Sequence, residues 1–206
     1  RAWMVVAEDY APYDVNVTTH DPGPAALQRS GPADARYGVR VLITARGPIY
    51  DYCRCGGIAY VGIYGDPSAN AYQPAWVFTD ATTTDGVILA QAISHEVGHT
   101  LGLHHDGTTS TGGDNYYAGS GVWAPIMGVS YYAPLTQWSK GEYPLANNQE
   151  DDTAIIGTVL GVRPDDHADG LAGAEALPGG VASQRAGIIG TRADVDAFTL
   201  TTGEQA

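Results

Sequence analysis

The chain has 206 residues, enough for one domain or for one domain with part of a second. Hydrophobic residues make up 44% of it, which is sufficient for a buried core, and 23 acidic against 10 basic residues give a formal net charge of −13. This acidic balance argues against nucleic acid or an anionic membrane surface as a partner. No apolar run reaches the roughly 18 residues that a membrane span requires.

The first part of the chain predicts a helix followed by four strands. Residues 2–10 read as the end of a helix, so we expect a further segment upstream of Arg1. Alternating or continuous apolar residues predict strands at 15–19, 39–44, 58–63 and 75–79. Prolines and glycines predict a loop with room for one helical turn at 20–35, and a second loop at 45–57.

A longer helix with recognisable ends follows the fourth strand. Thr84 and Asp85 are candidate N-caps, because their side-chain oxygens can accept hydrogen bonds from the first backbone N–H groups. Apolar residues recur every four positions from 93 to 101, which predicts one buried helix face. Gly102 comes directly after this stripe, where a helix end favours glycine.

The second half of the chain has less regular patterns. Residues 106–150 form a long segment rich in Gly, Tyr, Trp, Asn and Pro, and ordered segments of this length are often functional. We expect a short helix at 151–160 and strand-like pieces at 187–190 and 195–200. The composition changes near residue 163, so we divide the chain into a domain at 1–162 and a linker with a partial β segment at 163–206.

Four of the six histidines lie between residues 95 and 105. His95 and His99 are one helical turn apart, so their imidazoles can reach one metal ion, while Glu96 points about 100° away. A turn at Gly102 would let His105 approach the same ion. Three neutral nitrogens and a water form the open tetrahedral site of a catalytic zinc, which activates water and polarises a carbonyl.

Other histidines fit this pattern less well. His104 could in principle replace its neighbour His105 as the third ligand, but the spacing favours His105. His20 and His167 stand alone in the sequence and are expected at the surface. The alternative to a metal site is a helix with ordinary surface or core histidines. The short motif of His95, Glu96 and His99 arises by chance more often than the same motif extended by Gly102 and His105, so the extended motif disfavours this alternative.

The segment from His95 to Asp106 resembles the zinc motif of metzincin metalloproteases. Asp106, directly after the third histidine, is similar to the reprolysin (adamalysin) branch, and residues 125–128 resemble the Met-turn, with Met127 as an apolar floor below the metal. The resemblance implies an α/β (α+β) catalytic domain. Such a domain has a twisted mixed sheet, an antiparallel edge strand over the cleft, an active-site helix and an irregular lower subdomain.

The resemblance also implies a function. We expect a secreted, bacterial, zinc-dependent metalloendopeptidase in which Glu96 is the general base for a zinc-bound water that attacks the peptide bond. Its edge strand would bind an extended polypeptide substrate through Gly57, Ile58, Ala59 and Tyr60. We expect a monomer. Two alternatives are a non-catalytic zinc-containing protein-binding module on the same fold and an enzyme inactivated by truncation.

Several other residues carry weaker expectations. Tyr131 and Tyr132 follow Met127, and some metzincins use a tyrosine after this Met, although closer to it, so packing is the favoured role here. Cys53 and Cys55 are separated by one residue, a strained spacing for a disulfide, and a structural role is expected whether they are bridged or free.

Two groups of carboxylates could bind a second metal ion. Asp151 and Asp152, and the group Asp165, Asp166 and Asp169, would suit calcium, although their spacing matches no helix–loop–helix calcium motif and solvated surface charge is the alternative. The segment from about residue 165 is similar to the first part of the pre-peptidase C-terminal domain, a small β-sandwich of secreted bacterial proteases.

Overall fold

The computed structural model describes residues 1–82, 85–110, 113, 115–178 and 183–201. Its helices are α1 (Ala2–Asp9), α2 (Pro48–Cys53), α3 (Thr79–Thr82), α4 (Gly86–Thr100) and α5 (Asp152–Leu160), with 3-10 turns at Pro24–Ala26 and Pro67–Tyr72. Its strands are β1 (Val41–Thr44), β2 (Gly57–Ile58), β3 (Ala75–Phe78), β4 (Trp123–Pro125), β5 (Leu135–Gln137), β6 (Glu175–Ala176) and β7 (Phe198–Thr199). The fold is therefore mixed α/β, as predicted.

The main sheet has the strand order β1–β3–β2, with β1 parallel and β2 antiparallel to β3. The predicted antiparallel edge strand is therefore present, but it ends at Ile58 instead of 63. Beyond it, the backbone N–H groups of Gly62 and Tyr64 donate to the carbonyls of His99 and Thr100 at the end of α4. These hydrogen bonds to the helix take the place of a longer strand ladder.

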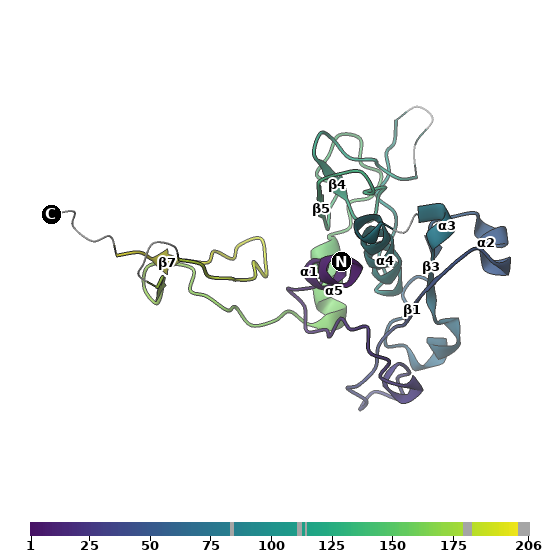
Figure 1. Cartoon of the computed structure of the whole chain (residues 1–206), viewed down its shortest axis with the longest axis horizontal. Coiled ribbons are helices and arrows are strands. Elements are labelled where there is room, and N and C mark those ends of the chain that lie inside the picture. The colour runs from purple at the N-terminus through teal and green to yellow at the C-terminus, as the bar shows by residue number, and fades with distance from the viewer. Residues whose placement is uncertain (83–84, 111–112, 114, 179–182, 202–206) are drawn as a thin grey trace.

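Helix α4 is the central element of the core. Asp85 caps its N-terminus by accepting hydrogen bonds from Val87 N and Ile88 N, whereas the other cap candidate, Thr84, lies outside the described residues. The chain leaves the helix through Gly102, whose φ of +107° favours glycine. Figure 1 shows α4 between α1 on one side and the β1–β3 sheet on the other, and α4 packs against both α1 and β3.

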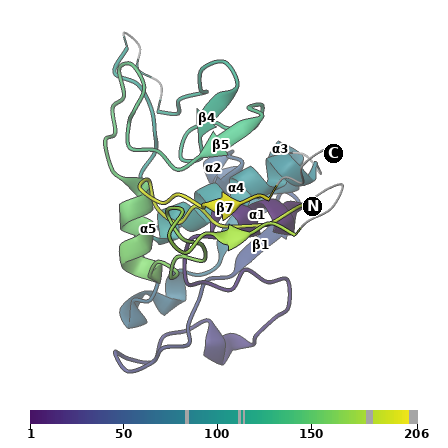
Figure 2. The ribbon, with the colours of Figure 1, turned by 90° about the vertical axis from the view of Figure 1, so that its left-hand side faces the viewer.

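The core joins elements that are distant in the sequence. Buried residues of α1, β3, α4 and α5 form one cluster with Met127, and Ile156 of α5 is completely buried in it. The Tyr10 hydroxyl donates to the Ser94 carbonyl of α4, and the Trp138 indole donates to the Asp9 carbonyl. The two views place β4 and β5 on the opposite side of the helices from the loop that precedes β1 (Figure 2).

The strand predicted at 15–19 does not form. Arg163 donates from Nε to the Tyr13 carbonyl and from its guanidinium to the Val15 carbonyl, and Asp14 N donates to Gly161 O. The backbone at the start of this segment is therefore hydrogen-bonded to the end of α5 and the following linker. An alternating sequence pattern does not reveal this long-range partner.

The loop predicted at 45–57 contains the short helix α2, which the sequence analysis did not expect. Pro48 occupies its first turn, where proline is favoured because that N–H would have no helical partner. Cys53, the last residue of this helix, forms a disulfide with Cys55, which settles the state that the sequence left open. Arg54, between the two cysteines, has a left-handed backbone with a φ of +50°.

The chain continues past α5 into an extended segment that carries β6 and β7, which pair in parallel. In Figure 1 this segment runs away from the helices and the main sheet. Residues 187–190 are not a strand, and only Phe198–Thr199 of the strand-like piece at 195–200 is one. Arg192 contacts Glu142 at 3.0 Å. The division at residue 162 and the resemblance to a β-sandwich remain predictions.

In the described ranges, no helix has the length and apolar character needed to cross a membrane.

The burial of Ile156 predicts that α5 contributes to the stability of the whole core. We expect Ile156→Ala to lower the free energy of unfolding by about 2–5 kcal/mol, because it leaves a cavity in a fully buried site. Urea unfolding followed by circular dichroism measures this loss. Ile155→Ala, at a half-buried position on the same helix, serves as the control and should cost less. Equal losses would contradict the proposed position of Ile156 in the core.

Candidate metal centre

The three predicted ligand histidines come together. His95 and His99 project from α4 one turn apart, and the chain reverses through Gly102 to bring His105 beside them. The Nε2 atoms of His99 and His105 are 2.9 Å apart, and one nitrogen of each of the three rings lies within 4.8 Å of the others. This arrangement places three imidazole nitrogens around one point.

Backbone carbonyls orient two of these rings. His95 Nδ1 lies 2.8 Å from the Ile126 carbonyl, and His99 Nδ1 lies 2.8 Å from the Leu103 carbonyl. Because a carbonyl oxygen only accepts, each Nδ1 carries the proton and each Nε2 is left with a free lone pair. Such hydrogen bonds are the usual way in which a protein fixes the tautomer of a metal ligand.

Burial keeps the three imidazoles neutral. It lowers the pKa of His95 to about 3, with a further contribution from His99, and lowers the pKa of His105 to about 4. The pKa of His99 is also lowered, again mainly by burial. Neutral imidazole is the form that binds a metal.

Glu96 is a buried carboxylic acid beside this cluster, only 5% exposed. Its Oε2 is buried and has no hydrogen-bond partner among the described residues, and burial raises its pKa to about 8. A nearby divalent cation would favour its charged form. A carboxyl group with a pKa this close to neutral, at a cluster of potential metal ligands, is suited to accept and return a proton.

The donor set fits zinc. Three neutral imidazole nitrogens converge, two of them are oriented by carbonyls, and His105 is only partly buried, which leaves access to the cluster. His104 is not part of it, because its Nδ1 lies 2.8 Å from Glu150 and its side chain is 64% exposed. The structure thereby separates the two histidines between which the sequence left a choice.

Met127 packs against helix α4, which carries His95 and His99. It is fully buried, and a Cβ built on Gly98 would lie 2.7 Å from its sulfur, so α4 and Met127 approach each other closely at this glycine. Asp106 N donates to the Met127 carbonyl, which ties the end of the histidine motif to this segment. The position agrees with an apolar floor, while the identity of residues 125–128 as a Met-turn remains a prediction.

The four predicted substrate-binding residues lie at the edge of the main sheet. Gly57 and Ile58 form β2 and pair with Val77 and Trp76, and Ala59 and Tyr60 continue beyond the strand. A Cβ at Gly57 would lie 2.5 Å from Glu96 Oε1, so this edge is in contact with the buried carboxyl. The Tyr60 ring is 59% exposed and packs on another tyrosine. Substrate binding by these residues remains a prediction.

One aromatic residue near the cluster was missed by the sequence analysis. The Tyr116 ring lies 4.2 Å from the His105 ring, measured between centroids. The two tyrosines considered from the sequence lie differently: Tyr131 packs against the hydrophobic core and Tyr132 is 88% exposed. Tyr116 stands in an irregular segment without hydrophobic periodicity, so no sequence signal placed it beside a ligand.

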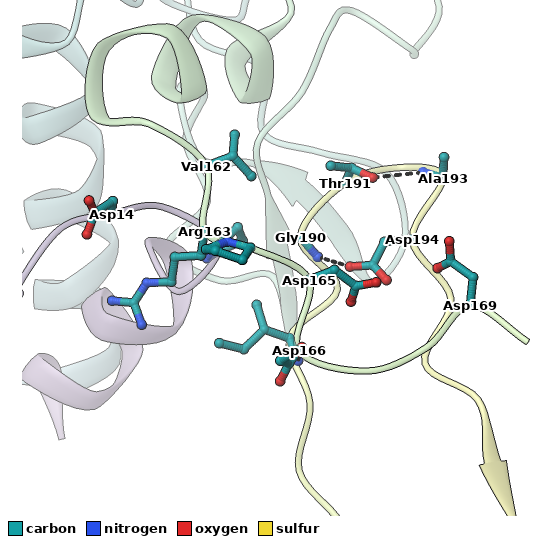
Figure 3. Close-up of a pocket in the computed structure, with 13 residues that line it drawn as sticks. Asp14, Val162, Arg163, Asp165, Asp166, Asp169, Gly190, Thr191, Ala193 and Asp194 are labelled. Atoms are coloured by element: carbon teal, nitrogen blue, oxygen red, sulfur yellow. Dashed lines mark hydrogen bonds between the residues drawn. The ribbon is translucent and has the colours of Figure 1, made fainter. Parts of the chain in front are cut away.

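The acidic residues considered for calcium fall into two settings. Asp151 caps α5 by accepting from Ala154 N, and Asp152 is buried and accepts from Ser139 N, so these two have structural roles. Asp165 lies near Asp194 and Asp196, with carboxylate oxygens within 4.8 Å of one another. Asp165 and Asp194 line a cavity of about 620 Å³. Figure 3 shows their side chains among the residues that line it. Exposed acidic groups often cluster without an ion, so calcium binding remains a prediction.

Comparison with known proteins supports a peptidase. Residues 18–106 match a family model described as Metallo-peptidase family M12B Reprolysin-like. No curated protein and no solved structure matches the chain. The matched range contains the main sheet, α4, all three histidines of the cluster and Glu96, and it ends at Asp106. The part of this chain that holds the metal-ligand cluster is thus similar to the reprolysin-like metallopeptidases of family M12B.

Proposed function

We propose that the protein is a zinc-dependent metalloendopeptidase. The observation that carries this proposal is the convergence of three imidazole nitrogens beside the buried carboxyl of Glu96, whose Oε2 has no hydrogen-bond partner among the described residues. A structural zinc site would fill its coordination sphere with protein ligands and would not need such a carboxyl next to it. The match to reprolysin-like metallopeptidases over the same residues supports this reading.

His95, His99 and His105 are the residues that would hold zinc, and the bound ion would supply Lewis acidity at the scissile carbonyl. Glu96 accepts a proton from the attacking water and returns it to the leaving amine, which needs one group that can exist in both protonation states near neutral pH. Glu96 Oε2 accepts no hydrogen bond from the part of the chain that the structure describes, so this oxygen is available for the transfer.

The substrate is a polypeptide bound in extended form along β2. The outer side of this strand has no neighbour in the described part of the sheet, and an edge strand can pair with a peptide through backbone hydrogen bonds. Gly57 and Ile58 are next to Glu96, so a peptide paired there passes the proton-transferring group. Ala59 and Tyr60 extend the same surface.

We also propose that the protein acts outside the cell as a monomer. The Cys53–Cys55 disulfide supports an oxidising compartment, because cytosolic thiols are usually kept reduced. A net charge of −13 agrees with a soluble protein that repels its own copies.

Removal of the Glu96 carboxylate separates the enzyme from a zinc-containing binding module. We expect Glu96→Gln to keep one zinc per chain, because Glu96 is not a ligand, and to slow cleavage of an unfolded protein substrate by roughly 10²–10⁴-fold. Metal analysis and a peptidase assay on the same sample test this. A Glu96→Gln variant with near-normal turnover would refute the assignment, and a wild-type chain that binds zinc without cleaving would favour the binding module.

The neighbouring histidines provide a matched pair for the metal site. We expect His105→Ala to lose zinc and cleavage together, because it removes one of three ligands, and His104→Ala to keep both, because His104 points to Glu150. A strong chelator should abolish cleavage by the wild type, and added zinc should restore it. If His104→Ala lost zinc and His105→Ala kept it, His104 would be the third ligand instead of His105.

Gly57 tests the contact between the sheet edge and Glu96. A Cβ there would lie 2.5 Å from Glu96 Oε1 and 2.7 Å from the Trp76 carbonyl, so Gly57→Ala must displace the carboxyl or β2. We expect cleavage to fall by about 10- to 100-fold with the zinc content unchanged. Gly47→Ala is the control, because no atom lies within 4 Å of a Cβ at that position. Equal activity of both variants would show that this contact does not matter.

A further inference from the structure

Tyr116 stands against the cluster of histidines on its accessible side. Its ring centroid lies 4.2 Å from that of His105 and 6.1 Å from that of His95, with interplanar angles of 40° and 32°. The residue is 43% exposed, so the ring covers one ligand while part of the side chain faces solvent. This is the position of a residue that a molecule bound at the cluster would meet.

The backbone beside Tyr116 is held from two sides. The N–H of the next residue, Tyr117, donates to the Asp106 carbonyl at the end of the histidine motif, and the Tyr117 carbonyl accepts from Val129 N, two residues after Met127. The Tyr117 ring stacks on Tyr143 at 4.1 Å with an angle of 8°. The segment is thereby tied to the same framework that places His105, and Tyr116 is presented to the cluster by an anchored neighbour.

The hydroxyl of Tyr116 makes no hydrogen bond to any of the described residues, whereas the buried Tyr10 and Tyr143 hydroxyls each donate to a backbone carbonyl. It is therefore free to bind a ligand. A tyrosine hydroxyl is protonated at neutral pH and can donate a hydrogen bond.

We propose that Tyr116 is a further catalytic residue, whose hydroxyl donates a hydrogen bond to the oxygen of the scissile carbonyl as negative charge develops on it. This inference rests on the proposed peptidase function and extends it by one residue. A neutral donor aimed at developing charge stabilises the transition state more than the ground state, and losing one such donor typically costs about 10²–10³-fold in kcat.

Two other roles make different predictions. If Tyr116 only covered His105, cleavage would depend on the Tyr116 ring and not on its hydroxyl. If Tyr131 were the donor, removal of the Tyr131 hydroxyl would lower kcat instead. Tyr131, however, packs against the hydrophobic core and is only partly exposed, which leaves it less accessible to a substrate than Tyr116.

The test removes one hydroxyl at a time and keeps each ring. Tyr116→Phe, Tyr131→Phe and the exposed control Tyr132→Phe are compared with the wild type for zinc content, for kcat and KM on one peptide, and for the Kd of a phosphinic peptide measured by calorimetry. The phosphinic group imitates the tetrahedral, negatively charged transition state. We expect Tyr116→Phe to keep one zinc per chain, to lower kcat by about 100-fold with little change in KM, and to raise that Kd by a comparable factor.

Three results would overturn the inference. Wild-type kcat and Kd in Tyr116→Phe would mean that the Tyr116 ring only covers His105. Loss of zinc in Tyr116→Phe would assign Tyr116 a structural role. A lower kcat and a weaker Kd in Tyr131→Phe alone would identify Tyr131 as the donor. Failure of the proposed function is distinguished in the wild type itself, which would then neither cleave the peptide nor bind the phosphinic compound.

Discussion

The site depends on burying polar groups inside the helix that also forms the core. Helix α4 packs against α1 and the sheet, yet it carries two imidazoles and a carboxyl that are each less than a tenth exposed. A buried polar group without a partner is costly, and here the partners of the histidines are the carbonyls of Ile126 and Leu103. The same hydrogen bonds that make burial tolerable also turn the Nε2 lone pairs of His95 and His99 toward a common point. The same contacts therefore serve the stability of the core and the convergence of the imidazole nitrogens.

Two glycines allow α4 to have the neighbours that the site needs. Gly98 lets the fully buried Met127 approach within van der Waals contact, and Gly57 brings the sheet edge against Glu96. At each position even a methyl group would meet a neighbouring atom closer than 3 Å. The Glu96 carboxyl, the cluster of histidines and the candidate peptide-binding edge are thus brought together by small residues. Among the described residues, Glu96 Oε2 has no hydrogen-bond partner.

The irregular segment between the histidine motif and α5 has its own organisation. Tyr117 and Tyr143 stack, and their backbone and hydroxyl hydrogen bonds join residues 106–107 to residue 129. An aromatic framework of this kind can position a functional side chain without regular secondary structure, because its rings and hydrogen bonds restrict the backbone. This packing accounts for two tyrosines of the segment, Tyr117 and Tyr143, whereas the Tyr116 ring lies against the cluster of histidines.

The sequence by itself determined the parts that depend on local spacing. The helix that carries His95 and His99, a cap at Thr84 or Asp85, the turn at Gly102 and the convergence of the three histidines follow from a period of 3.6 residues and from backbone preferences within a few positions. Tertiary structure decided whatever depends on distant partners. It replaced the strand at 15–19 by hydrogen bonds to Arg163, shortened β2 because residues 62–64 bind the end of α4, and placed Tyr116 on His105. These outcomes were not predictable, since each is set by a group that local periodicity does not encode.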